Sequence, residues 1–110
     1  MTAHPRLSLN QATVRHATLP EAVDAALEAG YQALGTWRAP VLDLGLPAAE
    51  RLIAASGLRV STHCRGGFFT LPEGPDRRAA IDDNRRAIEE AAASLGFRRN
   101  AFARSLRTNR

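Results

Sequence analysis

The sequence predicts an α/β fold in which short parallel strands alternate with helices, and three observations indicate it. Strand-like segments begin near Leu7, Ala33 and Arg59, 26 residues apart, which is the length of one strand–helix unit. The helix-like segments that follow them end at glycine, a residue that commonly terminates helices. Strands that alternate with helices form parallel sheets, and right-handed connections bring their C-termini to one edge. We therefore expect about three βα units whose loops gather at that edge.

The first unit is predicted to join a strand at residues 7–10 to a helix that begins after Thr18. Thr18 can cap the first turn, Glu21 can complete a capping box, and Pro20 stands where its missing N–H costs nothing. The apolar positions of this helix fall on one stripe at helical spacing: Leu19, Ala22, Val23, Ala26 and Leu27. Gly30 is predicted to end the helix.

The second unit is predicted to begin with a strand at residues 33–37. A loop is expected to follow through Pro40, and Pro47 then opens a short helix that Gly57 ends. The predicted inward side chains of this helix are Ala49, Leu52 and Ile53.

The third unit is predicted to hold a strand at residues 58–63, a loop at residues 66–76 and the longest helix. The buried stripe of that helix is expected to contain Ile81, Ile88, Ala92 and Leu95, with Gly96 as its stop.

The C-terminal tail differs in charge from the rest of the chain. Residues 1–97 carry ten arginines and eleven acidic residues, whereas residues 98–110 carry five arginines and no acid. The tail also begins where the pattern requires a fourth apolar strand. We expect residues 97–110 to form an irregular Arg-rich tail, either disordered or produced by a frameshift in an Arg-rich, GC-rich reading frame, after a domain at residues 1–96. Three strands would leave two unpaired edges, so a weakly stable or self-associating product is expected.

Composition bounds the classes of protein to which the chain can belong. One domain is the most that 110 residues should hold. No apolar segment has the length of a membrane span or of a secretory signal. We therefore expect a cytoplasmic protein without a membrane partner. A single cysteine, Cys64, excludes an internal disulfide framework. All fifteen basic residues are arginine, but those of residues 1–97 are interleaved with acids, which disfavours a nucleic-acid partner.

Polar side chains near the three strand ends form the candidate site. The residues at or near those ends are Asn10, Trp37 and His63, and those just behind them are Gln11, Arg38 and Arg65. His63 can act as a metal ligand, a general base or a hydrogen-bond partner of a sugar hydroxyl. Because no second ligand accompanies it, substrate contact or a structural hydrogen bond is favoured over metal binding. Cys64 points to the opposite face of the strand from His63 and is expected to be an inert, packed thiol.

The other site residues each have two open interpretations. Trp37 and Arg38 can form the wall of a polyol pocket, or the indole can simply fill space in the interior. Asn10 can bind a hydroxyl or cap a turn. Arg65, before a pair of glycines, can bind a carboxylate or phosphate. The acidic residues of the outer helices are expected to be solvated: Glu21, Asp24, Glu28, Glu89 and Glu90.

Four segments together resemble the N-terminal part of a known family. They are LSLNQAT at residues 7–13, ALGTWR at residues 33–38, RVSTHCRGGFF at residues 59–69 and IDDNRRAIEEAA at residues 81–92. In these segments the chain resembles the sugar phosphate isomerase/epimerase family, whose members are (β/α)8 TIM barrels of the xylose-isomerase-like superfamily. The resemblance covers about residues 6–96, so it implies a partial barrel.

The resemblance implies a reaction and a set of binding residues. Members of the family interconvert sugars or related polyols by proton transfer, with a divalent metal (Mn, Mg or Zn). By resemblance, Asn10, Trp37, His63 and Arg65 line the substrate side of the barrel mouth and bind a sugar or sugar-phosphate-like molecule. The metal ligands and paired catalytic glutamates of the family come from later strands, so no catalytic or metal residue is assigned, and the chain is expected to be inactive alone. Two alternatives stay open: an abasic-site endonuclease-like barrel fragment, and binding of nucleic acid or an acidic partner through the Arg-rich tail.

Overall fold

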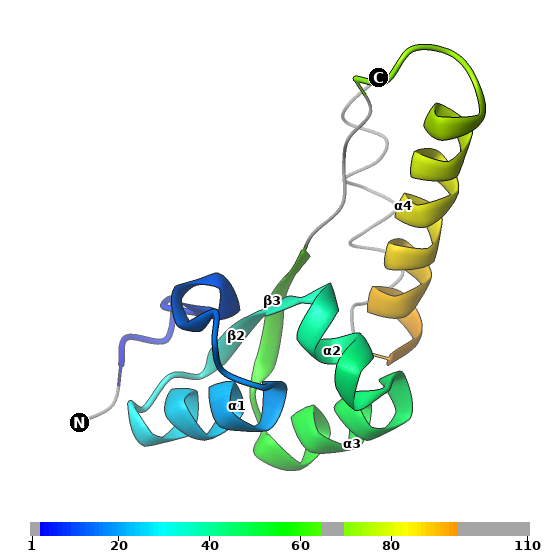
Figure 1. Ribbon diagram of the computed structural model, residues 1–110. Helices are drawn as coiled ribbons and strands as arrows, with labels where there is room; N and C mark the ends of the chain where they lie inside the picture. Colours follow the sequence, from blue (N-terminus) through cyan, green and yellow to red (C-terminus); the bar gives the residue numbers. More distant parts are fainter. Residues whose placement is uncertain (1–2, 65–69, 95–110) are drawn as a thin grey trace.

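A three-stranded parallel sheet forms the centre of the protein. The computed structural model describes residues 3–64 and 70–94 of the chain. The strands are β1 (Leu9–Asn10), β2 (Ala33–Trp37) and β3 (Arg59–Cys64), and they lie in the order β1-β2-β3 with every pair parallel (Figure 1). The predicted α/β class with a parallel sheet is confirmed. The first strand is shorter than predicted, and Leu7 is half exposed.

Helices connect the strands and follow the last of them. They are the 3-10 helix η1 (Gln11–Val14) and the α-helices α1 (Leu19–Glu28), α2 (Arg38–Leu44), α3 (Leu46–Ser56) and α4 (Pro75–Ser94). Both crossovers move along the sheet in the same direction, so right-handed connections place their helices on one face of it. Figure 1 shows α4 standing out from the rest of the molecule, which it meets at its C-terminal half. Within the described ranges, no helix combines the length and the apolarity that a membrane span requires.

The 26-residue spacing of the sequence appears directly in the strand register. Ala33 lies opposite Arg59, but the register shifts by one residue between Leu34 and Gly35, so that Thr36 lies opposite His63. At this irregularity, a Cβ at Gly35 would lie 2.7 Å from the Thr62 hydroxyl oxygen. A side chain at position 35 would therefore require the Thr62 side chain to move. The shift decides which polar groups meet at the end of the sheet.

The core lies between the sheet and the helices α1, α2 and α3. Its buried side chains are Leu19, Val23, Ala26, Leu34, Val41, Ala49, Ile53 and Leu58. The predicted capping box is confirmed: the Glu21 N–H donates to the Thr18 hydroxyl, and the Thr18 N–H donates to the Glu21 carboxylate. Gly30 and Gly57 follow α1 and α3 with positive φ, as predicted for glycines that end helices.

Three details of the prediction were wrong. The loop expected through Pro40 is part of α2, because a proline is tolerated in the first turn, where backbone N–H groups have no helical partner. The fully buried residue of α4 is Ala91, whereas Ile81, Ile88 and Ala92 are only partly buried; Leu95 and Gly96 lie outside the described residues. Leu27, on the predicted apolar stripe of α1, is 45% exposed.

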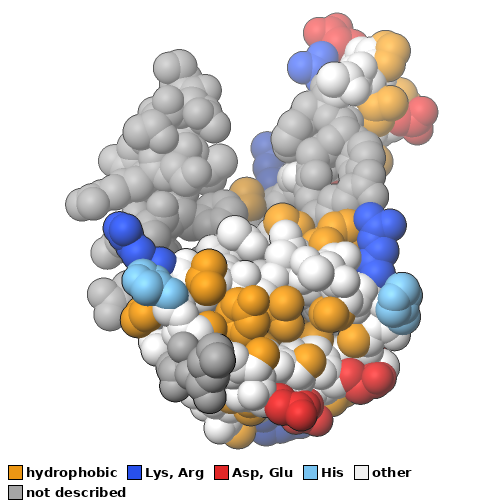
Figure 2. Space-filling model, turned by 90° about the vertical axis from the view of Figure 1, so that its left-hand side faces the viewer, with side chains coloured by type: hydrophobic (Ala, Val, Ile, Leu, Met, Phe, Trp, Pro, Cys, Tyr) orange, Lys and Arg blue, Asp and Glu red, His pale blue; other side chains and the backbone are white. Residues whose placement is uncertain are grey.

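Several large apolar side chains lie at the surface. Among residues 3–64 and 70–94, those exposed by more than a third are Leu7, Leu27, Leu42, Leu44 and Leu71. Figure 2 shows hydrophobic side chains gathered in a band across the middle of one side of the molecule, with acidic side chains below the band.

Candidate functional site

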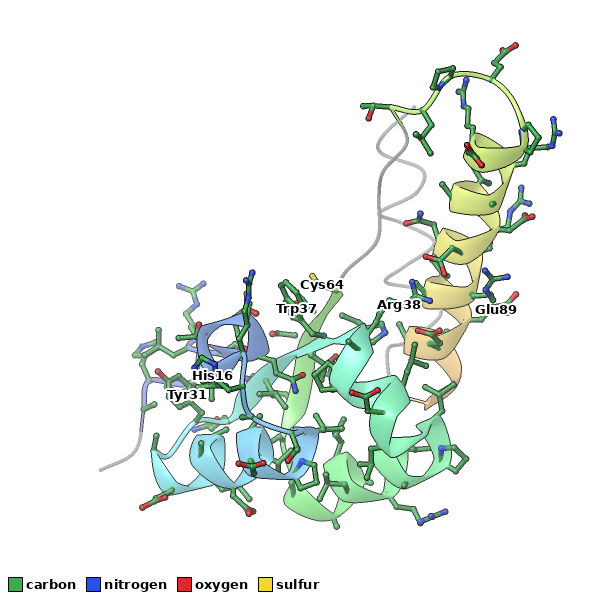
Figure 3. All side chains as sticks on the ribbon, viewed as in Figure 1. His16, Tyr31, Trp37, Arg38, Cys64 and Glu89 are labelled. Carbon is green, nitrogen blue, oxygen red and sulfur yellow. The ribbon has the colours of Figure 1, made fainter. Side chains whose placement is uncertain are left out.

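The carboxyl ends of the three strands lie side by side at one edge of the sheet. β1 passes directly into η1, β2 passes directly into α2, and β3 ends at Cys64 opposite Trp37. This is the edge at which α/β proteins assemble their binding sites. Two features adjoin there: a cluster of charged side chains and a cleft. Figure 3 shows Arg38 directed toward α4 and Trp37 beside Cys64. Of these two consecutive residues, Arg38 therefore belongs to the charged cluster and Trp37 to the cleft.

The charged cluster is centred on the guanidinium of Arg38. Its Nε and Nη2 atoms donate to the two carboxylate oxygens of Glu90, each at 3.0 Å. Its Nη1 and Nη2 atoms donate to the carboxylate of Asp83 at 2.8 and 3.2 Å. Both acids belong to α4 and lie seven residues, about two turns, apart. The side chains of Arg38 and Glu90 are only 13% and 10% exposed, so this pairing holds α4 against the start of α2 with little competition from water.

His63 extends the cluster to the sheet. Its Nε2 lies 3.3 Å from a Glu90 carboxylate oxygen and its Nδ1 lies 2.8 Å from the Thr36 hydroxyl. A carboxylate only accepts, so Nε2 carries the proton, and in the neutral ring Nδ1 then accepts from Thr36. We call Thr36, Arg38, His63, Asp83 and Glu90 the strand-end cluster. It joins two strands and two helices.

The proton affinities of the cluster follow from this geometry. Burial lowers the pKa of His63, against the opposing effect of its hydrogen bond to Glu90, so the imidazole is neutral at pH 7. Burial alone would raise the pKa of Glu90, but hydrogen bonds from Arg38 and His63 outweigh it and lower that pKa. Hydrogen bonding to Arg38 lowers the pKa of Asp83, and the bonds to Glu90 and Asp83 raise the pKa of Arg38. The cluster therefore holds one cation, two anions and a neutral ring.

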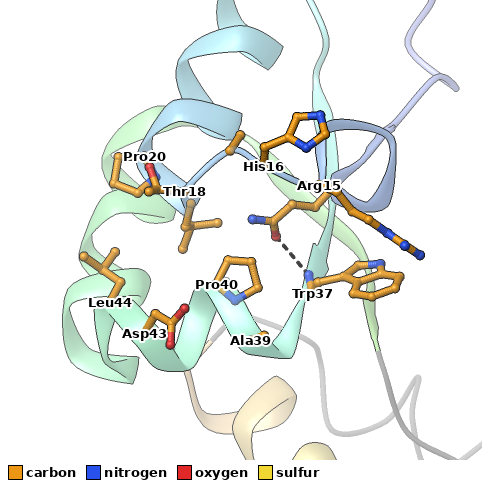
Figure 4. A pocket seen from close by; sticks show the side chains of 12 residues that line it. Arg15, His16, Thr18, Pro20, Trp37, Ala39, Pro40, Asp43 and Leu44 are labelled. Atoms are coloured by element: carbon orange, nitrogen blue, oxygen red, sulfur yellow. Dashed lines mark hydrogen bonds between the residues drawn. The ribbon is translucent and has the colours of Figure 1, made fainter.

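The cleft lies between the η1–α1 connection and α2 and has a volume of about 700 Å³ (Figure 4). Its lining residues are Gln11, Arg15, His16, Ala17, Thr18, Leu19, Pro20, Trp37, Ala39, Pro40, Asp43 and Leu44. The guanidinium carbon of Arg15 lies 5.4 Å from the centroid of the Trp37 ring, which is a cation–π contact. Gln11 is buried, and its Oε1 accepts the Trp37 backbone N–H at 2.9 Å, the bond dashed in Figure 4. The strand ends thus position an aromatic ring, a cation and an amide along one cavity.

The structure does not bring the four predicted site residues together at one place. Trp37 lines the cleft, whereas His63 lies in the strand-end cluster with its side chain 2% exposed. Asn10 is exposed and caps η1 by accepting the Ala12 N–H at 3.0 Å, and Arg65 lies outside the described residues. The substrate-binding roles of all four stay predictions. The tail, on which nucleic-acid binding depends, also lies outside the described residues.

Sequence reasoning missed the roles of several residues at this edge. Glu90 was expected at the solvated surface, and this was wrong because it binds Arg38 and His63; its neighbour Glu89 is exposed. The seven-residue spacing of Asp83 and Glu90 on one helix face is the signal that could have revealed the pair. Gln11 and Arg15 received no binding role, because Arg38 was expected to accompany Trp37.

The described charged groups offer few ligands for a divalent metal. Among residues 3–64 and 70–94, no group of three or more His, Cys, Asp and Glu side chains is arranged to hold a metal ion. The nearest approach to a ligand pair is His63 with Glu90, but both oxygens of Glu90 already accept from Arg38. A cation at that carboxylate would meet the guanidinium, so this pair is unsuited to hold a metal ion, and the metal that the resemblance implies would depend on ligands from later strands.

Comparison with known proteins identifies one informative relative. The crystal structure of protein SMc04130 from Sinorhizobium meliloti 1021 aligns with 82% of this chain, with a TM-score of 0.75 and 48% sequence identity. The aligned part covers 33% of that protein, so this chain spans about a third of its length. No protein-family model and no curated protein matches the chain.

Proposed function

We propose that this chain forms the sugar-binding part of a (β/α)-barrel isomerase or epimerase. The observation that carries the proposal is the pairing of Trp37 with Arg15 in a cleft at the carboxyl ends of parallel strands. An indole ring stacks on the carbon face of a sugar. A guanidinium above the ring keeps its N–H edge available for a phosphate or carboxylate. The ligand proposed is therefore a sugar or sugar phosphate.

The pair formed by Trp37 and Arg15 replaces the pair of Trp37 and Arg38 that was expected from the sequence. Arg38 follows Trp37 in the chain, but its donors are used by Glu90 and Asp83. Arg15 approaches the same ring from the η1–α1 connection, and the structure gives it no carboxylate partner among the described residues. Arg15 is therefore the proposed anion-binding residue of the cleft.

The architecture and the comparison agree with a partial barrel. A (β/α)8 barrel takes roughly 250 residues, and three successive βα units correspond to about a third of it. The chain aligns with 33% of the length of the Sinorhizobium protein. Proton transfer between sugar carbons, assisted by Mn, Mg or Zn, belongs to the proposal for the whole barrel. The described residues are proposed to bind and orient the substrate, and no chemical step is assigned to them.

Tryptophan fluorescence tests the proposal directly, because Trp37 is the only tryptophan in the chain. Fructose 6-phosphate is the probe, and we expect it to change the emission in a saturable way. Arg15→Gln should weaken binding by about tenfold, because the phosphate loses its charged donor. Arg51→Gln, an exposed arginine on α3, is the control and should bind as the unchanged chain does. An unresponsive Trp37 would overturn the proposal.

An activity assay addresses the chemical step separately. We expect the purified chain to show no isomerase turnover with fructose 6-phosphate in the presence of added Mn²⁺ or Mg²⁺. Robust turnover would overturn the assignment of the chain to binding alone.

A further inference from the structure

One buried polar group of the cleft lacks a partner. Gln11 is 2% exposed, and its Nε2 is the one fully buried side-chain nitrogen or oxygen among the described residues that makes no hydrogen bond. The other end of the same amide is fixed, because Oε1 accepts the Trp37 N–H. The amide cannot turn over to satisfy Nε2 without losing that bond. A buried donor without an acceptor is unfavourable, so the position is prepared for an oxygen that arrives with a ligand.

The charges of the cleft lie at opposite sides of this amide. Figure 4 shows the Arg15 guanidinium extending over Trp37, away from Asp43 on α2. Asp43 is exposed and has no ion pair among the residues that the structure describes. The lining of the cleft also includes the apolar side chains of Pro20, Pro40 and Leu44, and Figure 4 shows Pro40 between the two charges. One side of the cleft thus attracts an anionic group, and the other side accepts hydrogen bonds and repels anions.

We infer that Gln11 is the buried anchor of a ligand that carries a single anionic group. Its Nε2 donates to a carbonyl or hydroxyl oxygen of the ligand, the anionic group lies at Arg15, and the hydroxyl groups at the other end donate to Asp43. The chemical class is a monophosphorylated sugar or a sugar acid, and a bisphosphate is disfavoured by Asp43. This inference rests on the proposed function and adds to it the anchor residue, the orientation and the charge of the ligand.

The side-chain signals of glutamine provide the decisive test. The chain contains two glutamines, and Gln32 is exposed outside the cleft, so its NH₂ group is an internal control. In NMR spectra of the ¹⁵N-labelled chain, saturating fructose 6-phosphate should shift the Gln11 NH₂ signals and leave those of Gln32 unchanged. A purely structural Gln11 would not respond, and this readout needs no substitution in the buried site.

Variants test the energetics and the charge selectivity. Gln11→Glu keeps the acceptor for the Trp37 N–H but replaces the donor with a carboxylate, so fructose 6-phosphate should bind at least tenfold more weakly, whereas Gln32→Glu should leave its binding unchanged. Fructose 1,6-bisphosphate should bind more weakly than the monophosphate, and Asp43→Asn should remove most of that difference. Equal binding of the two probes by the unchanged chain would overturn the assigned role of Asp43.

The outcomes separate this inference from the proposed function. If Trp37 fluorescence saturates with fructose 6-phosphate but the Gln11 signals do not move, the ligand contacts only Trp37 and Arg15. The inference is then overturned, for instance because a water satisfies Nε2, and the proposed function stands. If neither Trp37 nor Gln11 responds to any probe, both are overturned.

Discussion

The buried imidazole of His63 makes the stability of the chain depend on pH. Burial lowers its pKa from the ordinary value of 6.5, so the unfolded chain binds the proton more strongly than the folded one. The stabilisation is complete above pH 6.5 and is lost as the pH falls toward the folded-state pKa. We expect the urea midpoint to fall between pH 7.5 and pH 5.5, and to fall less in His63→Gln. An equal fall of the urea midpoint in the unchanged chain and in His63→Gln would contradict this role of His63.

Glu90 and Glu89 form a matched pair of adjacent carboxylates. Glu90 accepts from Arg38 and His63, whereas Glu89 is exposed and Figure 3 shows it on the outer side of α4. Glu90→Gln should lower the free energy of unfolding by about 1–3 kcal/mol, because two buried donors lose their charged acceptor. Glu89→Gln should change it by less than about 0.5 kcal/mol. Urea denaturation measures both, and equal effects would show that the cluster contributes nothing specific.

For single residues, the sequence predicts the position in a strand or helix better than it predicts the side-chain contacts. Asn10, Trp37 and His63 were placed at or near strand ends by the strand-like pattern of each segment, because the position of a residue within a strand is a local property. The bond from Arg38 to Glu90 joins residues 52 positions apart and depends on how α4 docks. The cation–π contact of Arg15 likewise depends on the path of η1, which no sequence pattern indicates.

Helix α1 is the element that local chemistry explains most completely. Its capping box was predicted from Thr18 and Glu21 and is formed by hydrogen bonds in both directions. Thr18→Ala should therefore lower the free energy of unfolding by about 1 kcal/mol. Thr13→Ala, an exposed threonine of η1, is the control and should have a smaller effect. Equal midpoints for the two variants in urea would show that the box does not stabilise the chain.

The features that the sequence did not predict arise from contacts between segments that are distant in the chain or from patterns that fit two structures. Helix α2 follows β2 without a loop. The sequence did not predict its start, because a proline such as Pro40 is usual both in loops and in a first helical turn. The register shift between Leu34 and Gly35 arises from contact between two strands, so nothing in either strand alone reveals it. That shift nevertheless brings His63 opposite Thr36 and so determines the shape of the cluster.

The whole molecule exposes apolar surface that favours association. Leu27 on α1 and Leu42 on α2 are 45% and 47% exposed. We expect the sedimentation coefficient to rise with protein concentration, and the double variant Leu27→Gln, Leu42→Gln to reduce that rise. Sedimentation velocity between about 10 and 300 μM, a range in which weak association is visible, measures it. A monomer that melts cooperatively at every concentration would contradict the expectation.

The guanidinium of Arg38 also restricts how α4 can turn. It binds the carboxylates of two residues whose backbone positions lie about 10 Å apart along the helix axis, so α4 cannot roll about that axis without breaking these hydrogen bonds. Arg38 is joined by a single peptide bond to Trp37, whose indole forms a wall of the cleft. The side chain that docks α4 and the aromatic wall of the cleft therefore stand on neighbouring residues of the backbone.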